Sequence, residues 1–76
     1  MEWEWIGNPE ASLMGRCNGY IVRLKAIGNG WYCHVWFKSK KVFDSEDAGI
    51  LPQTGDAARR LCELVVRVEL GRAGHG

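Results

Sequence analysis

Hydrophobic and polar positions alternate most regularly in two segments, residues 20–27 and 31–38. Both are rich in β-branched and aromatic residues, and they flank Gly28-Asn29-Gly30. Such alternation is typical of half-buried strands. Asn-Gly suits a two-residue type I′ turn, because both central residues of that turn take positive φ. The sequence therefore predicts a β-hairpin with Asn29-Gly30 as its turn.

The predicted turn fixes a register in which the two faces of the hairpin differ in character. On one face, which is wholly apolar, Ala26 pairs with Cys33, Leu24 with Val35 and Val22 with Phe37. On the other face, Ile27 pairs with Tyr32, Lys25 with His34, Arg23 with Trp36 and Ile21 with Lys38. A slip of one residue would mix the two sets, so this segregation supports the phase of the alternation.

Shorter strands are expected on both sides of the hairpin. Residues 2–6 alternate charged and apolar side chains, which predicts a strand with Trp3 and Trp5 on one face. These rings either extend the open face of the sheet or close the edge of the core, and the second interpretation is favoured. Residues 12–16 form another candidate strand, ended by Asn18-Gly19. A tight basic turn at Ser39-Lys40 leads to a possible edge strand over residues 41–44, followed by a loop over residues 45–53.

The last third of the chain predicts a helix over residues 56–70, capped by Thr54 or Asp56 and ended by Gly71. Its apolar side chains fall in an arc of roughly 160°. They are Ala57, Ala58, Leu61, Cys62, Leu64, Val65 and Val68. The valine-rich residues 65–70 also suit a strand, but the upstream pattern favours a helix.

These elements predict a single α+β domain over residues 1–71, followed by a flexible tail over residues 72–76. An antiparallel sheet of three to four strands would pack one face on the C-terminal helix and leave its other face open. With 76 residues, the chain lies near the lower size limit for a domain held together by one apolar core.

Charge and cysteine content indicate the kind of surface and the cellular compartment to expect. The net charge is +1, but residues 11–43 contain six basic and no acidic residues, which predicts a polarised surface. Three cysteines without the spacing of a disulfide scaffold, and an acidic start unlike a signal peptide, favour a cytoplasmic protein. No apolar run approaches the roughly 20 residues that span a bilayer, so we expect no membrane partner.

The open sheet face holds the candidate binding residues, which are Tyr32, Trp36, Arg23, Lys25, His34 and Lys38. Three interpretations fit an aromatic pair among basic side chains. The face can bind another protein, including a second copy of this chain, since Trp, Tyr and Arg anchor protein interfaces. It can stack bases and neutralise phosphates of a single-stranded nucleic acid. Alternatively, Arg23 covers Trp36 in a cation–π contact and nothing binds.

Catalysis, metal binding and cofactor binding find little support in the sequence. Cys17, Cys33, His34, Cys62 and His75 form no C-x-x-C pair and no zinc-type spacing. His34 and His75 lie in no recognisable nucleophile motif. Carboxylates can pair for acid–base catalysis, but the acidic group Asp44, Glu46 and Asp47 lies in a predicted loop and is more typical of a solvated turn. We therefore expect a protein that is not an enzyme and has no metal, cofactor or small-molecule substrate.

Several short segments resemble small Trp-rich proteins encoded by phages and prophages. They are Trp3-Glu4-Trp5, Gly19-Tyr20-Ile21-Val22, Gly30-Trp31 and a helix with Ala57, Ala58 and Cys62. The resemblance implies a few antiparallel strands followed by a helix. It also implies an accessory factor that binds and redirects host machinery, as inhibitors of CRISPR systems do. It assigns no functional residue, and the connection over residues 43–53 is longer than the pattern has.

Overall fold

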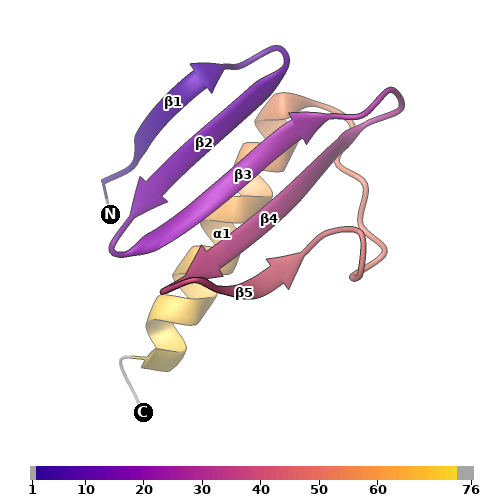
Figure 1. The fold of residues 1–76 in the computed structure, drawn as a ribbon. Helices are drawn as coiled ribbons and strands as arrows, with labels where there is room; N and C mark the ends of the chain where they lie inside the picture. The colour runs from indigo at the N-terminus through magenta and orange to yellow at the C-terminus, as the bar shows by residue number, and fades with distance from the viewer. Residues whose placement is uncertain (1, 74–76) are drawn as a thin grey trace.

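The fold has two layers, an antiparallel sheet and one helix packed behind it (Figure 1). The computed structural model describes residues 2–73. The five strands are β1 (Glu4–Asn8), β2 (Ser12–Cys17), β3 (Tyr20–Ala26), β4 (Trp31–Phe37) and β5 (Lys40–Asp44), and the helix is α1 (Gly55–Ala73). The strands lie in chain order, β1-β2-β3-β4-β5, so each is paired with its sequence neighbour.

The predicted α+β class, with an antiparallel sheet on one C-terminal helix, is confirmed, but the strand count of three to four is wrong. The segments predicted as strands at residues 2–6 and 41–44 both join the sheet, with shifted bounds, as β1, which pairs with β2, and β5, which pairs with β4. Short connections bring each strand back beside the previous one, and this allows even weakly patterned segments to join the sheet. None of residues 2–73 forms a helix both long and apolar enough to cross a membrane.

The hairpin of β3 and β4 exists, but its register differs from the predicted one by two residues. Ala26 pairs with Trp31, Leu24 with Cys33 and Val22 with Val35. A four-residue loop, residues 27–30, replaces the two-residue turn. Within it Gly28 has φ 72°, whereas Asn29 has no positive φ.

The cause of the longer loop lies far away in the sequence. The Trp31 N–H donates to the Pro52 carbonyl at 2.8 Å, and the Ile27 N–H donates to the Gly30 carbonyl at 2.8 Å. A Cβ on Gly30 would lie 2.7 Å from the Leu51 side chain, so the loop before the helix presses directly on this bend. Tertiary contact therefore overrides the local preference of Asn-Gly for a type I′ turn.

A two-residue shift leaves every side chain on its predicted face, because strand side chains alternate with period two. Cross-strand neighbours do change: Arg23 lies opposite His34, Lys25 opposite Tyr32, and Ile21 opposite Trp36. The predicted pairs of Arg23 with Trp36 and Lys25 with His34 are therefore wrong.

The two other tight turns have positive φ at both central residues, as type I′ turns require. Asn18 (φ 50°) and Gly19 (φ 85°) connect β2 to β3, as the sequence suggests. Lys38 (φ 50°) and Ser39 (φ 68°) connect β4 to β5. The turn predicted at Ser39-Lys40 is thus one residue too late, because neither Lys nor Ser signals the left-handed conformation that this bend requires.

The core lies between α1 and the apolar face of β2, β3 and β4. Its buried members are Leu13, Tyr20, Val22, Leu24, Trp31, Cys33, Val35, Ala58, Cys62 and Val66. On the helix the buried stripe is Ala58, Cys62 and Val66, whereas Leu64 and Val68 are 53% and 50% exposed. The predicted arc was therefore too wide on one side and wrong in leaving out Val66, because a helix lying on one sheet buries only a narrow stripe and the sheet decides which one.

The helix begins as predicted and ends later than predicted. The Thr54 hydroxyl accepts a hydrogen bond from the Ala57 N–H at 3.0 Å, which is an N-cap. The valine-rich residues 65–70 are helical, and the helix continues through Gly71 to Ala73, so Gly71 does not end it. Residues 72 and 73 of the predicted tail belong to this helix, and residues 74–76, with His75, lie outside the described residues.

Trp3 and Trp5 pack against the edge of the core, as the sequence predicts. Their rings stack with centroids 5.1 Å apart, and the Arg59 guanidinium lies 5.9 Å from the centre of the Trp5 ring. A Cβ on Gly15 would lie 2.5 Å from the Trp5 ring, so glycine allows this close approach. Trp3 and Trp5 therefore do not extend the open face.

Candidate binding site on the open sheet face

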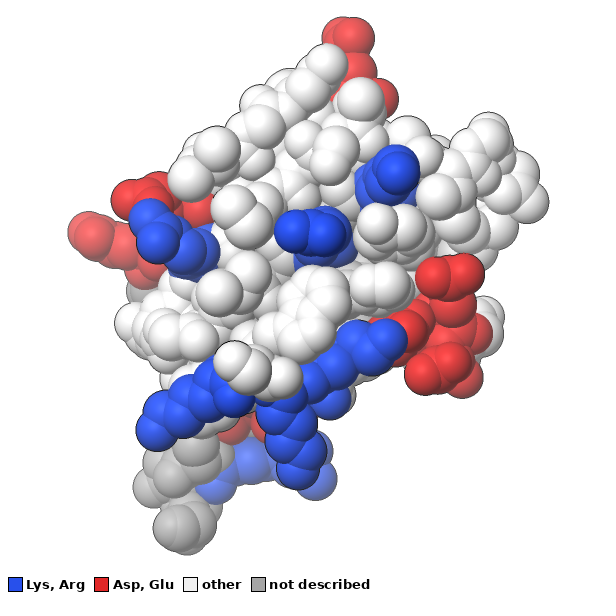
Figure 2. All heavy atoms as spheres, viewed as in Figure 1, with Lys and Arg blue, Asp and Glu red and all other residues white. Residues whose placement is uncertain are grey.

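The open face is the side of the sheet turned away from α1. Figure 2 shows it with Lys and Arg side chains separated by uncharged surface over the strands and gathered where β4 turns into β5. A group of acidic side chains lies beyond the end of β5. The residues of this face lie in cross-strand rows, such as Met14, Arg23, His34 and Asp44.

Three aromatic rings form a row along β4. Tyr32 and His34 stack with centroids 4.5 Å apart and planes 10° apart, and His34 meets Trp36 edge to face at 5.5 Å. All three side chains are half-buried. Since Tyr32 and His34 cover each other, the row presents a compact aromatic surface with few free ring faces.

Two cations of β3 flank this row without a partner of their own. Arg23 and Lys25 are exposed, and neither makes an ion pair with any residue in the described range 2–73. In the same range, the cation–π contacts are Lys38 over Phe37 and Arg59 over Trp5. The cation–π contact of Arg23 with Trp36, one of the three interpretations of this face, is therefore not formed among the described residues.

A shallow hollow of about 320 Å³ opens beside Trp36. Its lining comes from β2, β3, β4 and the following turn, namely Met14, Ile21, Arg23, Trp36, Lys38 and Ser39. Ile21 is 42% exposed although it is apolar. The hollow thus combines apolar walls with two cations at its rim, which is the composition of a small binding site for an apolar group carrying negative charge nearby.

A second open groove, of about 440 Å³, lies at the C-terminal end of β2, between residues 2–4 and the β2–β3 turn. Trp3, Glu4 and Arg16 are among its lining residues. Arg16 and Glu4 form an ion pair there, so these charges already neutralise each other. The hollow beside Trp36 is therefore the better candidate although it is smaller.

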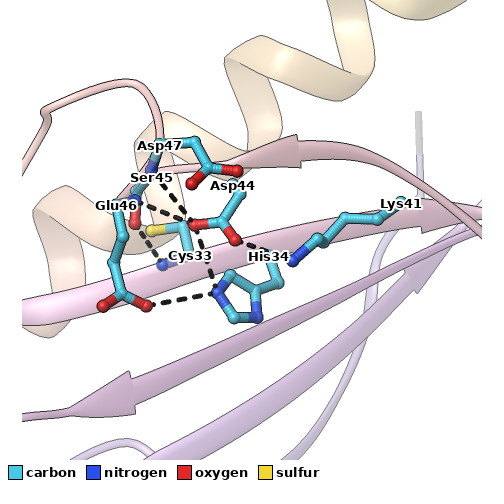
Figure 3. A network of polar contacts seen from close by, with 7 residues as sticks. All are labelled: Cys33, His34, Lys41, Asp44, Ser45, Glu46 and Asp47. Atoms are coloured by element: carbon cyan, nitrogen blue, oxygen red, sulfur yellow. Dashed lines mark hydrogen bonds and ion pairs between the residues drawn. The ribbon is translucent and has the colours of Figure 1, made fainter.

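The middle ring of the aromatic row, His34, contacts a polar network that is drawn in Figure 3. A bulge between Val35 and Trp36 brings Asp44 opposite His34. The His34 Nε2 lies 3.4 Å from Asp44 Oδ1 and 3.6 Å from Glu46 Oε1. Lys41 Nζ donates to Asp44 Oδ2 at 2.7 Å, and this contact lowers the pKa of Asp44 and raises the pKa of Lys41.

Ser45 fixes the backbone between these two carboxylates. It is fully buried, and its hydroxyl accepts a hydrogen bond from the Cys33 N–H at 2.8 Å. The Ser45 N–H in turn donates to the Cys33 carbonyl at 2.9 Å. One serine therefore continues the pairing with β4 past the end of β5 and places Asp44 and Glu46 beside His34.

The cysteines contribute to the core and not to this face. Cys33 on β4 and Cys62 on α1 are fully buried, and Cys17 is 3% exposed. The Cys33 thiol donates to the Ala58 carbonyl at 3.5 Å. The hydrogen bond that Cys62 makes with Cys33, together with burial, raises the pKa of the Cys62 thiol. Cys33 and His34, being adjacent on a strand, lie on opposite faces.

The structure places Arg23, Lys25, Tyr32, His34 and Trp36 on the open face, with Lys38 in the turn at the rim of the hollow. The sequence analysis placed Ile21 on the open face without counting it as a site residue, did not single out Met14, and interpreted Asp44 and Glu46 as part of a solvated turn. The alternation of residues 12–16 could have indicated Met14. Asp44 depends on a bulge, which no local pattern reveals.

Comparisons of this chain with protein-family models, with curated proteins and with solved structures find no match. The fold and the open face therefore define the class to which the chain can be assigned, an α+β protein with a five-stranded antiparallel meander covered on one side by a helix.

Proposed function

We propose that this protein is a non-enzymatic binding module that holds a segment of another protein on its open sheet face. The segment would place an apolar side chain in the hollow beside Trp36 and acidic side chains against Arg23, Lys25 and Lys38. One observation carries the proposal: an apolar hollow is rimmed by cations that have no ion-pair partner among residues 2–73. Trp and Arg in such a setting are typical anchors of protein interfaces.

A protein segment fits this face better than a single-stranded nucleic acid. Stacking of bases requires free ring faces, but Tyr32 and His34 already stack on each other. A phosphate backbone also requires a continuous basic track, whereas Asp44 and Glu46 border the aromatic row. An acidic peptide would meet the cations of β3 and the β4–β5 turn and avoid these carboxylates.

The resemblance to small Trp-rich phage and prophage proteins supports a host protein as the partner. An accessory factor of that kind would act by occupying a surface of host machinery in the cytoplasm, without chemistry of its own. The thin two-layer fold and shallow hollows agree with action by contact, since a small rigid face needs no deep pocket to cover part of a larger protein.

The test is to screen a displayed library of random peptides against the purified full chain and to select the peptides that bind. We expect the selected peptides to combine a bulky apolar residue with Asp or Glu. Their affinity should fall by about tenfold or more for Trp36→Ala, because truncating a central aromatic anchor commonly costs 1–2 kcal/mol or more. Arg23→Glu should weaken binding as well by opposing the acidic residues.

Arg67→Glu is the matched control, since Arg67 is an exposed arginine on the outer side of the helix. It should leave peptide affinity unchanged, and circular dichroism should show that all three variants are folded. Peptides that bind the folded Trp36→Ala variant as tightly as the parent chain would refute the site.

Tight binding of a mixed-sequence single-stranded oligonucleotide, with an affinity that falls steeply as salt is added, would support the nucleic-acid alternative instead. A dimer in sedimentation that Trp36→Ala disrupts would show that the face serves self-association.

A further inference from the structure

The polar network at the β5 edge of the open face brings together one imidazole and two carboxylates. A ring nitrogen of His34, an oxygen of Asp44 and an oxygen of Glu46 all lie within 4.8 Å of one another. In Figure 3 the two carboxylates approach the same ring nitrogen from neighbouring positions. Nitrogen and carboxylate oxygen are the donor atoms that bind divalent transition metals.

The spacing of these atoms suits a tetrahedral ion. The Nε2 lies 3.4 Å from Asp44 Oδ1 and 3.6 Å from Glu46 Oε1. With bonds of about 2.1 Å, neighbouring ligands of a tetrahedral Zn²⁺ lie about 3.4 Å apart. Neighbouring ligands of an octahedral Mg²⁺, with bonds of similar length, lie only about 3.0 Å apart. The two separations from the ring nitrogen therefore match zinc geometry, and the two carboxylate oxygens lie within 4.8 Å of each other, a distance that the exposed Glu46 side chain can close.

An independent observation concerns the His34 ring nitrogen itself. The Nε2 atom is buried and has no hydrogen-bond partner among residues 2–73, although two carboxylates lie close to it. Stacking on Tyr32 and the edge contact with Trp36 hold the ring in this orientation. A buried polar atom without a partner is costly. A metal ion between the nitrogen and the two oxygens would satisfy it.

The surrounding contacts also hold the Asp44 carboxylate in place. Its Oδ2 accepts a hydrogen bond from Lys41 Nζ at 2.7 Å, and its Oδ1 accepts one from the Glu46 N–H at 2.9 Å. Outer contacts of this kind orient the carboxylate ligands of metal sites. Glu46 is different, because its side chain is 60% exposed and is free to adjust its position to an ion.

We propose that His34, Asp44 and Glu46 form a binding site for a divalent transition-metal ion, for which Zn²⁺ is the best fit. The nitrogen donor favours Zn²⁺ over Mg²⁺ and Ca²⁺, and the two carboxylates balance its charge. Three protein ligands leave the fourth tetrahedral position to water. The ion would tie β4 to the segment that follows β5, and this proposal does not depend on the proposed peptide-binding function.

Calorimetric titration of the tag-free full chain with ZnCl₂ tests the site. We expect one ion per chain and no comparable binding of MgCl₂. Co²⁺ in place of Zn²⁺ should give the strong visible absorption of a tetrahedral site. At Zn²⁺ concentrations about a hundredfold above the Kd, the Tm should rise by on the order of 10 °C, because the ion binds only the folded chain.

Two variants and one control assign the ligands. His34→Gln and Glu46→Gln should each weaken Zn²⁺ binding by at least about tenfold, whereas Glu10→Gln, an exposed glutamate in the β1–β2 turn, should not. Glu46→Gln changes a mostly exposed side chain, so we expect this variant to fold even if the His34→Gln variant is unstable. The proposal fails if Zn²⁺ leaves the Tm unchanged, as a simple ion pair of His34 with the carboxylates would require. It also fails if folded Glu46→Gln binds Zn²⁺ as tightly as the parent chain, which would assign the ion to the thiols or another site.

Discussion

Replacing Ser45 with alanine removes a single hydroxyl from the most constrained point of the β4–β5 edge. Ser45 is fully buried, and its Oγ is the acceptor for the Cys33 N–H at 2.8 Å. Cys33 is itself fully buried, so water cannot readily replace the lost acceptor. Ser45→Ala would therefore leave a donor inside the protein without a partner, which costs more than the loss of an exposed hydrogen bond.

The size of the effect follows from that unpaired donor. A buried N–H that loses its acceptor costs about 1–3 kcal/mol, and for a domain of this size 2 kcal/mol lowers the Tm by roughly 8–16 °C. A small domain with one core rarely has more than roughly 3–5 kcal/mol of net stability. Ser45→Ala should thus remove a large share of the free energy of unfolding.

Urea denaturation followed by tryptophan fluorescence measures this loss, and hydrogen exchange of the Cys33 amide measures its cause. The exchange of that amide should accelerate more than the exchange of its neighbours in β4. Ser12→Ala, at an exposed position of β2, is the matched control and should change stability by less than about 0.5 kcal/mol. If Ser45→Ala unfolds within 0.5 kcal/mol of the parent chain and the Cys33 amide exchanges at its original rate, the reasoning about this bond is wrong.

Two further predictions concern the β4–β5 turn and the thiols. Ser39 has φ 68°, a left-handed conformation that costs a non-glycine residue about 1–2 kcal/mol, so Ser39→Gly should raise the Tm by a few degrees after the added flexibility of glycine. Ser12→Gly, in a strand, should lower the Tm, and a lower Tm for Ser39→Gly would contradict this account of the turn. All three cysteines are buried, and the raised pKa of Cys62 disfavours its thiolate. A disulfide reagent that releases a coloured thiol on reaction should therefore label the native chain slowly and the urea-unfolded chain at once. Rapid labelling of any thiol in the native chain would show that the core opens more readily than its packing implies.

Local patterns were enough to predict which side chains lie on which face. The alternation in β3 and β4 placed Val22, Leu24, Cys33 and Val35 under the helix and Trp36 on the open side, and the structure agrees. This success survives the two-residue error in register because both registers have the same parity. The start of the helix was predicted to within two residues, with Thr54 or Asp56 as its cap, since an N-cap depends only on residues within one turn.

The candidate sites were only partly predictable. Arg23, Lys25, Tyr32, His34 and Trp36 were assigned to the open face from sequence. The hollow beside Trp36 also needs Met14 and Ile21, which strand order brings to it from β2 and β3. Which cation lies opposite which ring depended on the hairpin loop, and that loop depends on Pro52.

The amino-acid sequence by itself determined the faces of the strands, the amphipathic helix and its cap, because these follow from interactions between residues a few positions apart. Only the tertiary structure decided the register, the number of strands and the meeting of His34 with Asp44 and Glu46. The physical reason is that a shift by two residues leaves the alternation unchanged. The Trp31–Pro52 hydrogen bond, the bulge before Trp36 and the buried Ser45 hydroxyl each join segments that only the folded chain brings into contact.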